Sequence, residues 1–524
     1  MSDHAVVVGA GFGGLAAAIR LRALGYRVTL VEAGDQLGGR ARVFRRDGYI
    51  FDAGPTVITA PYLFDELFAT AGRDRRDYVD FLPVDPFYQV SFTDGTRFDY
   101  VGDEARLLDQ IASFDTRDVD GYRRMAEHAR LIFDVGYTQL ADQPFSRVAD
   151  MLRIVPDMAR LSAYRSVHAL VSRYIRDPRL RQVFSFEPLL VGGNPMKVPG
   201  IYLLIHWLER KWGVHFARGG TGALVAALGR LLDELGVDVR FGAPVEQLLV
   251  ENGRAVGLRL ESGAELRASL VVANADPTVV YGKWIDPRHL TSNHPSRLAR
   301  KRHSMSLFVG YFGTNRRYDS TQHHTIVLGP RYGELLQDIF ERKVLADDFS
   351  LYLHRPGKTD PNLAPDGCDG FYVLSPVPNQ ESSIDWESKR EAYFERILDE
   401  LERRELPGLR QHLTCKFSVD PRYFEGELRS HAGAAFGLEP RLTQSAYFRY
   451  HNASPDVRDL YFVGASTHPG AGLPGVLCSA KVLERVLASS GNVRREKSGA
   501  RQPGLPRHLS GLPASAIQRV SHGN

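Results

Sequence analysis

The stretch "AVVVGAGFGGLAAAIRLRALGYRVTLVEAG", Ala5 to Gly34, decides the fold. It opens on a continuously apolar run, which is typical of a buried parallel strand. The pattern Gly9-x-Gly11-x-x-Gly14 then turns the chain into an alanine-rich helix, and a second apolar strand ends at Glu32. This strand–turn–helix–strand context predicts an α/β fold with a Rossmann-type nucleotide-binding domain.

Each residue of this motif has its own physical task. Gly9 permits the tight turn, Gly11 lets the backbone approach a pyrophosphate, and Gly14 lets the helix pack closely on the strand. Glu32 is expected to accept hydrogen bonds from the ribose hydroxyls of an adenosine. Ala33 and Gly34 follow where a 2′-phosphate would want an arginine, which argues against NADP. A glycine-rich turn without a ligand is the alternative interpretation.

A second glycine-rich segment, "GDQLGGRARVFRRDGYIFDAGPTVI", follows directly. Gly38-Gly39-Arg40 places a cation beside a glycine turn, which suits a further phosphate contact, and Gly48-x-x-x-Asp52-x-Gly54 adds another chain reversal. The combination resembles the FAD-binding signature of the flavoproteins that include amine oxidases and carotenoid desaturases. The resemblance implies FAD as cofactor and adds Gly39, Arg40, Asp52 and Gly54 to its site. For Arg40 alone, a surface charge is the alternative.

The last such segment, "DLYFVGASTHPGAGLPGVLCSAKVLERVL", lies close to the C-terminus. We expect a strand over Leu460–Val463, a glycine-rich crossing near the flavin, and a helix that Pro474-Gly475 opens. The N-terminus of that helix would offer free N–H groups and positive dipole to the pyrimidine end of a flavin, which favours electron acceptance. The cofactor-binding residues expected here are Gly464, Ala465, Gly475 and Val476.

The nucleotide domain is interrupted and resumed. Residues 219–241 read as a helix followed by a strand, and residues 244–277 read as short strands joined by Asn252-Gly253 and Ser262-Gly263 turns. Val245 corresponds to a residue that contacts adenine through its backbone in FAD-fold relatives; a purely structural strand residue is the alternative. The predicted organisation is an FAD-binding domain in three parts (1–119, 219–284 and 426–489), a helical region (120–218), an α+β substrate domain (285–425) and a disordered basic tail (490–524).

Bulk composition narrows the class of protein. The formal net charge is +4, and most of that excess lies in the tail, so no basic field for nucleic acid is present. The three cysteines have no paired spacing, so neither a disulfide framework nor a metal site is indicated. The start of the chain lacks a signal peptide and no apolar run is long enough to span a bilayer, which predicts a cytoplasmic protein.

Landmarks along almost the whole chain, from Val6 to about Leu487, resemble the bacterial phytoene desaturase family of carotenoid biosynthesis. They are "GGRARV", "SFEPLLVGGNP", "LERKWGVHFARGGTGALV", "FSLYLHRPGKTDPNLAPDGCDGFYVLSPVPN", "EPRLTQSAYFRYHN" and "YFVGASTHPGAGLPGVLCSAK". One departure is Ala465-Ser466, where many flavoproteins carry an acidic residue or glycine. A phosphate or ribityl contact there must come from the backbone or from Ser466.

The resemblance implies an FAD-dependent oxidoreductase that inserts up to four double bonds into phytoene, toward lycopene. A C40 polyene has no polar handle, so a long apolar tunnel is expected to place it against flavin N5. A hydride would pass to N5 and a proton to a base or water, with oxygen or a quinone as final acceptor. Asp150 matches an acidic position of the family, with a helix-cap or ion-pair carboxylate as the alternative. His468 should pass near the flavin, with a loop-holding histidine as the alternative.

Residues 151–215 carry an excess of arginine and lysine beside aliphatic residues and two tryptophans. Such a surface fits a lipid membrane partner and peripheral attachment at the inner membrane face; ordinary core with solvated arginines is the alternative. Two other functions stay open. One is action on another polyene, as a C30 desaturase, a hydroxycarotenoid desaturase, a carotenoid oxidase or an isomerase. The other is a non-enzymatic prenyl-lipid carrier of the same fold, as in the GDP dissociation inhibitors, against which the intact glycine motif argues.

Overall fold

The N-terminal motif folds as strand, helix and strand. In a computed structural model that describes residues 3–489, β1 (His4–Val8) leads into α1 (Phe12–Ala23), and β2 (Arg27–Val31) returns beside β1 in parallel. A Cβ at Gly14 would overlap the carbonyl oxygen of Gly9, so only glycine permits this helix–strand approach. The predicted tail, 490–524, lies outside the described residues.

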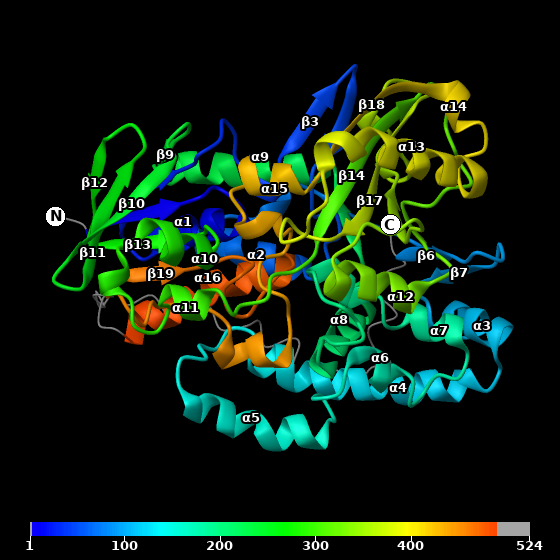
Figure 1. Ribbon diagram of the computed structural model, residues 1–524, viewed down its shortest axis with the longest axis horizontal. Helices are drawn as coiled ribbons and strands as arrows, with labels where there is room; N and C mark the ends of the chain where they lie inside the picture. Colours follow the sequence, from blue (N-terminus) through cyan, green and yellow to red (C-terminus); the bar gives the residue numbers. More distant parts are fainter. Residues whose placement is uncertain (1–2, 490–524) are drawn as a thin grey trace. The chain divides into compact units, whose positions relative to one another are not determined.

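These strands belong to a five-stranded parallel sheet assembled from three separate stretches of chain. Its order is β19-β13-β1-β2-β9, with β9 (Asp238–Arg240), β13 (Leu270–Ala273) and β19 (Leu460–Phe462). In Figure 1 the orange β19 lies beside the green β13, although almost two hundred residues separate them in sequence. The discontinuous Rossmann-type domain predicted from the sequence is confirmed.

A small antiparallel sheet is formed by the chain between β9 and β13 of the parallel sheet. It contains β10 (Val245–Glu251), β11 (Arg254–Leu260) and β12 (Glu265–Arg267), in that order. The first hairpin turns at Asn252-Gly253, where both residues have positive φ, as the Asn-Gly signal predicts. Leu248 and Leu258 of this sheet share one buried cluster with Val271 and Phe462 of the parallel sheet, so the two sheets form one packed half.

The other half is built on a seven-stranded sheet of order β18-β14-β17-β16-β15-β6-β7. The strands are β6 (Tyr88–Ser91), β7 (Arg97–Tyr100), β14 (Ser306–Thr314), β15 (His324–Val327), β16 (Leu351–His354), β17 (Asp369–Val377) and β18 (Leu413–Val419). β6 and β7 come from the segment assigned to the first part of the FAD domain, so residues 1–119 contribute to both halves. Two further strand pairs are β3 (Val43–Arg46) with β4 (Tyr49–Asp52), and β5 (Phe81–Pro83) with β8 (His215–Ala217).

The two faces of the seven-stranded sheet have different partners. Phe308 of β14 packs against Trp386 and Phe394 of the long helix α13 (Trp386–Arg404). Its neighbours Leu307 and Val309 point the opposite way and line a cavity. This alternation follows from the two-residue period of a strand.

Helices surround both sheets. They are α2 (Pro61–Thr70), α3 (Glu104–Phe114), α4 (Asp118–Phe133), α5 (Val148–Arg160), α6 (Val167–Val171), α7 (Pro178–Val183), α8 (Leu204–Trp212), α9 (Gly220–Glu234), α10 (Pro277–Val279), α11 (Pro295–Leu298), α12 (Tyr332–Gln337), α14 (Leu409–His412), α15 (Pro421–Gly426) and α16 (Leu473–Ser489). The region 120–218 is largely helical, and α5 stands apart from α4, α6 and α8 (Figure 1). Within residues 3–489, no helix combines the length and the hydropathy needed to cross a bilayer.

Candidate active site

A cavity of about 610 Å³ runs between the two halves of the fold. Its wall is mainly apolar, and it joins the glycine-rich turns of the parallel sheet to the inner face of the seven-stranded sheet. Most of the expected cofactor-binding residues lie on this wall: Gly9, Gly11, Glu32, Gly39, Arg40, Gly54, Val245, Gly464, Ala465, Gly475 and Val476. Segments from all three parts of the nucleotide domain therefore meet in one site.

Glycine turns form a main-chain surface at one end of the cavity, which we call the cofactor end. Gly38 N–H donates to the carbonyl of Ala10 at 2.8 Å, and Gly11 and Gly38 pair as an isolated bridge. A Cβ at Gly464 would meet Asn274 Oδ1 at 2.6 Å, and one at Gly54 would overlap the carbonyl of Arg40. Close packing behind these two positions therefore admits only glycine, and bare main chain lines the surface, as in a phosphate-binding loop.

Glu32 is fixed at the edge of this surface. Its carboxylate accepts hydrogen bonds from Ala10 N–H at 2.7 Å and from Gly34 N–H at 2.8 Å. The side chain is buried and lies on the cavity wall. A carboxylate held in this way keeps lone pairs for a ribose hydroxyl at the carboxyl end of β2, where the sequence places it.

Two arginines bring positive charge to the cofactor end. Arg40 donates from Nη2 to Ser430 Oγ at 2.7 Å, while its Nε and the Nε of Arg42 are buried without a partner. Burial lowers the pKa of the Arg40 guanidinium below its ordinary value. Two guanidiniums with buried, unpartnered Nε–H groups, beside a surface of bare backbone, fit a diphosphate group. This part of the FAD prediction is supported by the donors present.

Gly14 and Asp52 are not brought to the cavity wall. Gly14 serves the contact of α1 with β1, as expected for the third glycine. The buried Asp52 carboxylate instead accepts from Thr221 N–H at 3.0 Å and Gly222 N–H at 3.3 Å at the start of α9, and burial raises its pKa to about 6. Asp52 thus holds the cofactor end together by capping a helix rather than by facing the cavity.

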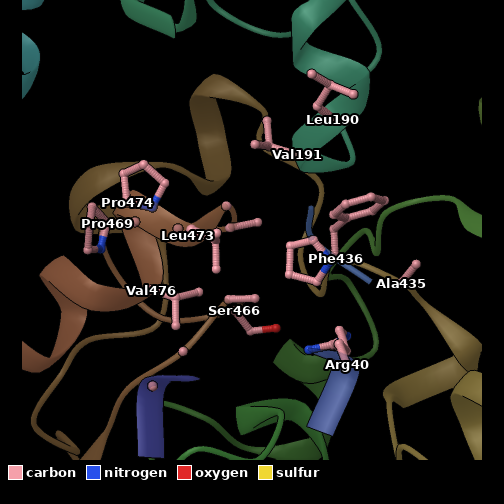
Figure 2. Close-up of a pocket in the computed structure, with 18 of the residues that line it drawn as sticks. Arg40, Leu190, Val191, Ala435, Phe436, Ser466, Pro469, Leu473, Pro474 and Val476 are labelled. Carbon is pink, nitrogen blue, oxygen red and sulfur yellow. The ribbon is translucent and has the colours of Figure 1, made fainter. Parts of the chain in front are cut away.

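The loop before α16 closes the cofactor end from the opposite side. Gly464 N–H donates to Ser479 Oγ at 2.9 Å, which ties the end of β19 to the first turns of α16. Figure 2 shows the Ser466 hydroxyl and the Arg40 guanidinium pointing toward each other across the pocket, with Val476 beside Ser466. Ser466 thus faces the cation of the Gly38-Gly39-Arg40 turn, and its role toward a phosphate or the ribityl chain stays a prediction.

Beyond Phe436 and Leu190 the wall becomes almost entirely apolar; we call this part the apolar end. It is lined by strand residues of the seven-stranded sheet and by helical residues from the region 120–218. They include Met151, Ile154, Met158, Phe186, Leu189, Leu204, Ile205, Leu208, Met305, Leu307, Val309, Ile326, Leu328, Leu374 and Pro376. This composition suits a hydrocarbon whose binding energy comes from buried apolar surface.

His468 lies on the cavity wall as expected. Its Nε2 is 3.0 Å from the carbonyl oxygen of Gln143, its ring contacts Phe145, and its Nδ1 is buried without a partner. Burial lowers the pKa of His468 to about 3, so the ring is a neutral imidazole. With Nε2–H donating to Gln143, the Nδ1 lone pair is free to accept a proton.

Asp150 does not lie on the cavity wall. It sits in the first turn of α5, where its carboxylate accepts from Arg147 N–H at 3.0 Å in a capping arrangement. The geometry therefore favours the helix-cap alternative over a catalytic base.

A buried carboxyl pair, Glu187 and Glu209, adjoins the apolar end. Glu209 lines the cavity, accepts from the Tyr88 hydroxyl at 2.8 Å, and leaves Oε2 without a partner. Burial raises the pKa of both carboxyl groups well above the ordinary value, and for Glu209 the charge of Glu187 adds to the effect. The pair therefore retains protons and keeps this part of the wall neutral.

Sequence reasoning missed several site residues. Asn274 contacts the Gly9–Gly14 turn and donates to the carbonyl of Gly9 at 3.3 Å; its position directly after β13 was the available signal, because ligands bind at the carboxyl ends of parallel strands. Ser430, Phe436 and Glu209 carry no local motif, since distant pairing brings them to the wall.

The fold and this site define a flavin-dependent oxidoreductase. Residues 12–481 match the family model of flavin containing amine oxidoreductases, so the chain belongs to that family and uses FAD. A putrescine oxidase bound to putrescine shares the fold, with a TM-score of 0.62 and 17% identity over 94% of this chain and 99% of that one.

Curated relatives place the chain more narrowly. It is 49% identical to the lycopene-forming phytoene desaturase of Pseudescherichia vulneris, over 92% of this chain and 98% of that protein. It is 42% identical to the neurosporene-forming phytoene desaturase of Rhodobacter capsulatus, over 92% of this chain and 94% of that protein. Within the flavin-containing oxidoreductases, the chain belongs to the bacterial phytoene desaturases.

Proposed function

We propose that the protein desaturates phytoene by successive FAD-dependent dehydrogenations, with lycopene as product. The observation that carries this proposal is a single cavity whose one end is a glycine-lined, arginine-bearing surface and whose other end is almost entirely apolar. Glu209 beside this part of the wall is kept neutral by its raised pKa, so it offers no charge to an amine substrate. The higher identity to the lycopene-forming relative than to the neurosporene-forming one supports lycopene as the product.

The chain's own residues bind, orient and exclude water. The apolar end would hold the polyene by burial of its hydrocarbon surface, so one single bond lies against the cofactor end. The chemistry that bound FAD supplies is hydride acceptance from a saturated carbon–carbon bond. Gly9, Gly11, Arg40 and Arg42 would hold its diphosphate and Glu32 its ribose. The electron pair would leave the protein on oxygen or a quinone.

We assign the proton acceptor to His468 Nδ1. It is neutral, faces no hydrogen-bond partner and lies in the loop that crosses the cofactor end. A low pKa is compatible with this role, because a carbon next to a centre that has lost a hydride is a strong acid and needs only a weak base. His468→Ala is expected to lower desaturation about 10²–10⁴-fold with FAD binding retained.

The test of the function is anaerobic mixing of the FAD-loaded protein with phytoene in liposomes. Without an acceptor, bleaching of the flavin absorbance is expected together with about one new double bond per bound flavin, since FAD takes up one electron pair. Once oxygen or a quinone is admitted to reoxidise the flavin, the absorption spectrum of the extract is expected to be that of lycopene. Flavin that stays oxidised with phytoene but bleaches with a C30 polyene would transfer the assignment to that substrate. A protein that binds no flavin would support the carrier instead.

We also propose that the protein works on the membrane surface, attached through α5. None of the residues of this helix is buried. Its Met151, Ile154 and Met158 line the cavity, whereas Val148, Leu152 and Val155 are 50–67% exposed. Exposed Phe448 lies in a turn, Ala446–Phe448, that contacts α5, and exposed Leu442 lies just before that turn. Arg153 lies on α5, and Arg147 and Arg165 flank the helix in sequence. A helix with an apolar outer face and flanking arginines suits an anionic bilayer, through which the polyene would enter the cavity.

Introducing negative charges on the exposed apolar face of α5 tests the attachment. The double variant Leu152→Asp/Val155→Asp should lose sedimentation with anionic liposomes at least about tenfold, because both side chains face solvent and their burial in lipid drives binding. The matched control is Asp399→Leu, which changes charge on the solvent side of α13 and should leave sedimentation unchanged. Equal sedimentation of the double variant and the wild type would refute attachment through α5.

A further inference from the structure

Three histidines meet in the interior of the seven-stranded sheet, outside the cavity wall. His324 of β15 and His354 of β16 are directly paired across the antiparallel ladder, and His323 precedes β15. All three side chains are at most 2% exposed. One ligand atom of each ring lies within 4.8 Å of those of the other two.

The hydrogen bonds of these rings leave nitrogen atoms free in the middle of the cluster. His323 Nδ1 is 2.5 Å from Thr359 Oγ1 and His324 Nδ1 is 2.6 Å from the Tyr352 hydroxyl, while Nε2 of both rings is buried without a partner. His354 has neither of its ring nitrogens partnered. An outer hydroxyl that fixes one nitrogen and leaves the other free is the arrangement that metal-binding histidines typically show.

The ring arrangement is compatible with a common ion. The ring centroids are 4.4, 4.8 and 5.4 Å apart. Rings bound to one tetrahedral zinc ion at about 2.0–2.1 Å have centroids about 5 Å apart and bound nitrogens about 3.4 Å apart. Small side-chain rotations would bring the three nitrogens to this separation.

We propose that His323, His324 and His354 bind one divalent transition-metal ion of the zinc class, in a structural role. Three imidazoles and an open fourth position suit Zn²⁺ or Co²⁺ rather than Mg²⁺ or Ca²⁺, which prefer oxygen ligands. The ion would join β15 to β16 and orient Tyr352, whose ring lines the cavity beside Tyr372. The site thus supports the cavity wall without taking part in the redox chemistry.

No negative side chain of the cluster offsets the charge of a bound metal ion, so its affinity depends on the fourth ligand. Arg355 follows His354, but its guanidinium is held by Asp369 at 2.8 Å and Asp319 at 3.0 Å. Among the described residues, the cluster itself contains no carboxylate. A water that ionises to hydroxide on the metal would therefore serve as the fourth ligand and offset part of the buried charge.

A second histidine group is a weaker candidate. His303, His431 and Glu381 also lie within 4.8 Å of one another. However, Glu381 is bound by Lys343 at 2.7 Å, and His303 Nε2 is already paired with Thr278 Oγ1 at 3.1 Å. The Lys343 ammonium at Glu381 already supplies the positive charge there and disfavours a cation, so the metal is assigned to the three-histidine cluster alone.

Metal content of the full-length, FAD-loaded protein tests the proposal, independently of activity. After incubation with Zn²⁺ and removal of the free ion by gel filtration, we expect about one equivalent per chain by elemental analysis. With Co²⁺ in its place, the visible absorption bands of a tetrahedral site should appear. The variants H324Q and H354Q should each retain at least tenfold less metal, while H412Q, which changes a half-buried histidine at the end of α14, should retain the full equivalent.

Two outcomes would overturn the assignment. One is wild-type protein that holds less than a tenth of an equivalent after loading, which would leave the free nitrogens to buried water. The other is H324Q and H354Q variants that bind as much metal as the wild type, which would place the ion on surface histidines. If both variants fail to fold, as judged by lost flavin absorbance, the Co²⁺ spectrum of the wild type decides: octahedral bands would refute a three-histidine tetrahedral site.

Discussion

The two ends of the cavity recognise their occupants by different means. The cofactor end is bare main chain with a few charged side chains, such as Arg40 and Glu32. The apolar end is lined by side chains from helices and strands that are far apart in sequence. Ionisable groups at its edge, such as Glu209, are neutral. Recognition at the cofactor end therefore depends on single atoms, whereas recognition at the apolar end is spread over many interchangeable contacts.

The most severe break is expected at the third glycine of the N-terminal motif. Gly14→Ala would place a methyl group into the carbonyl of Gly9 and separate α1 from β1. FAD binding should fall more than about 100-fold or the chain should fail to fold. Flavin content after purification measures the effect. Gly333→Ala, whose added Cβ meets nothing within 4 Å, is the control and should retain full flavin.

Loss of the Arg40 charge should weaken the cofactor end without changing the apolar end. In Arg40→Gln a buried donor set facing Ser466 is lost, so FAD affinity should fall about 10–100-fold. Fluorescence titration with FAD measures this loss. Arg403→Gln removes an exposed arginine paired with Glu400 and should leave the affinity unchanged. Equal affinity of Arg40→Gln and wild type would remove Arg40 from the cofactor site.

A polar group in the apolar end should impair substrate use and spare the cofactor. Leu374→Asn places an amide without a partner on the wall formed by β17, so phytoene turnover should fall about 5–50-fold while the FAD affinity stays constant. Leu374→Met keeps the wall apolar and should cost less than a few-fold. A parallel loss of FAD in the Asn variant would show that the two ends are not separable.

The smallest effect should come from the buried carboxyl pair. Because burial raises the pKa of Glu209, the folded chain binds a proton that the unfolded chain releases above about pH 4.5, so stability falls as the pH rises through the folded-state pKa. Glu209→Gln removes this titration and should raise the free energy of unfolding at pH 9 relative to wild type, with little change at pH 5. Urea unfolding at both pH values measures it.

At acidic pH, folding stability is lost because buried histidines have lowered pKa values. Burial lowers the pKa of His206 and of His468 to about 3, so the unfolded chain takes up protons below about pH 6.5 that the folded chain does not bind. Stability contributed by these neutral rings is therefore lost as the pH falls from 6.5 toward 3.

The sequence predicted the cofactor end better than the apolar end, because single required residues can be recognised in a sequence and interchangeable apolar residues cannot. A glycine is required where backbone or ligand approaches closely, so Gly9, Gly11 and Gly464 can be recognised one position at a time. In the sequence, an apolar wall residue such as Leu374 or Ile326 cannot be distinguished from a core residue. Only the pairing of strands β14, β17, β16 and β15 in one sheet shows that these side chains face the cavity. Local sequence does not contain that pairing.

Polar residues were also difficult to assign where two roles use the same chemistry. Asp52 resembles a cofactor ligand in its motif, yet its carboxylate caps α9. Asp150 caps α5 in the same way. A carboxylate that accepts backbone N–H groups serves a helix N-terminus as well as a ligand, so only the path of the chain separates these roles. His468, fixed by a carbonyl 325 residues earlier in the chain, reached the cavity as predicted.

The strands of the parallel sheet are synthesised at widely separated times. β2 is complete at Val31, but β19 begins only at Leu460, and both strands hold the same sheet. At about 5–20 residues per second, a ribosome needs roughly 20–90 s to cover that interval. The cofactor site that begins at the first glycine turn therefore stays incomplete until nearly the whole chain has been made. A prematurely terminated product lacks β19 and α16, and it would remain colourless.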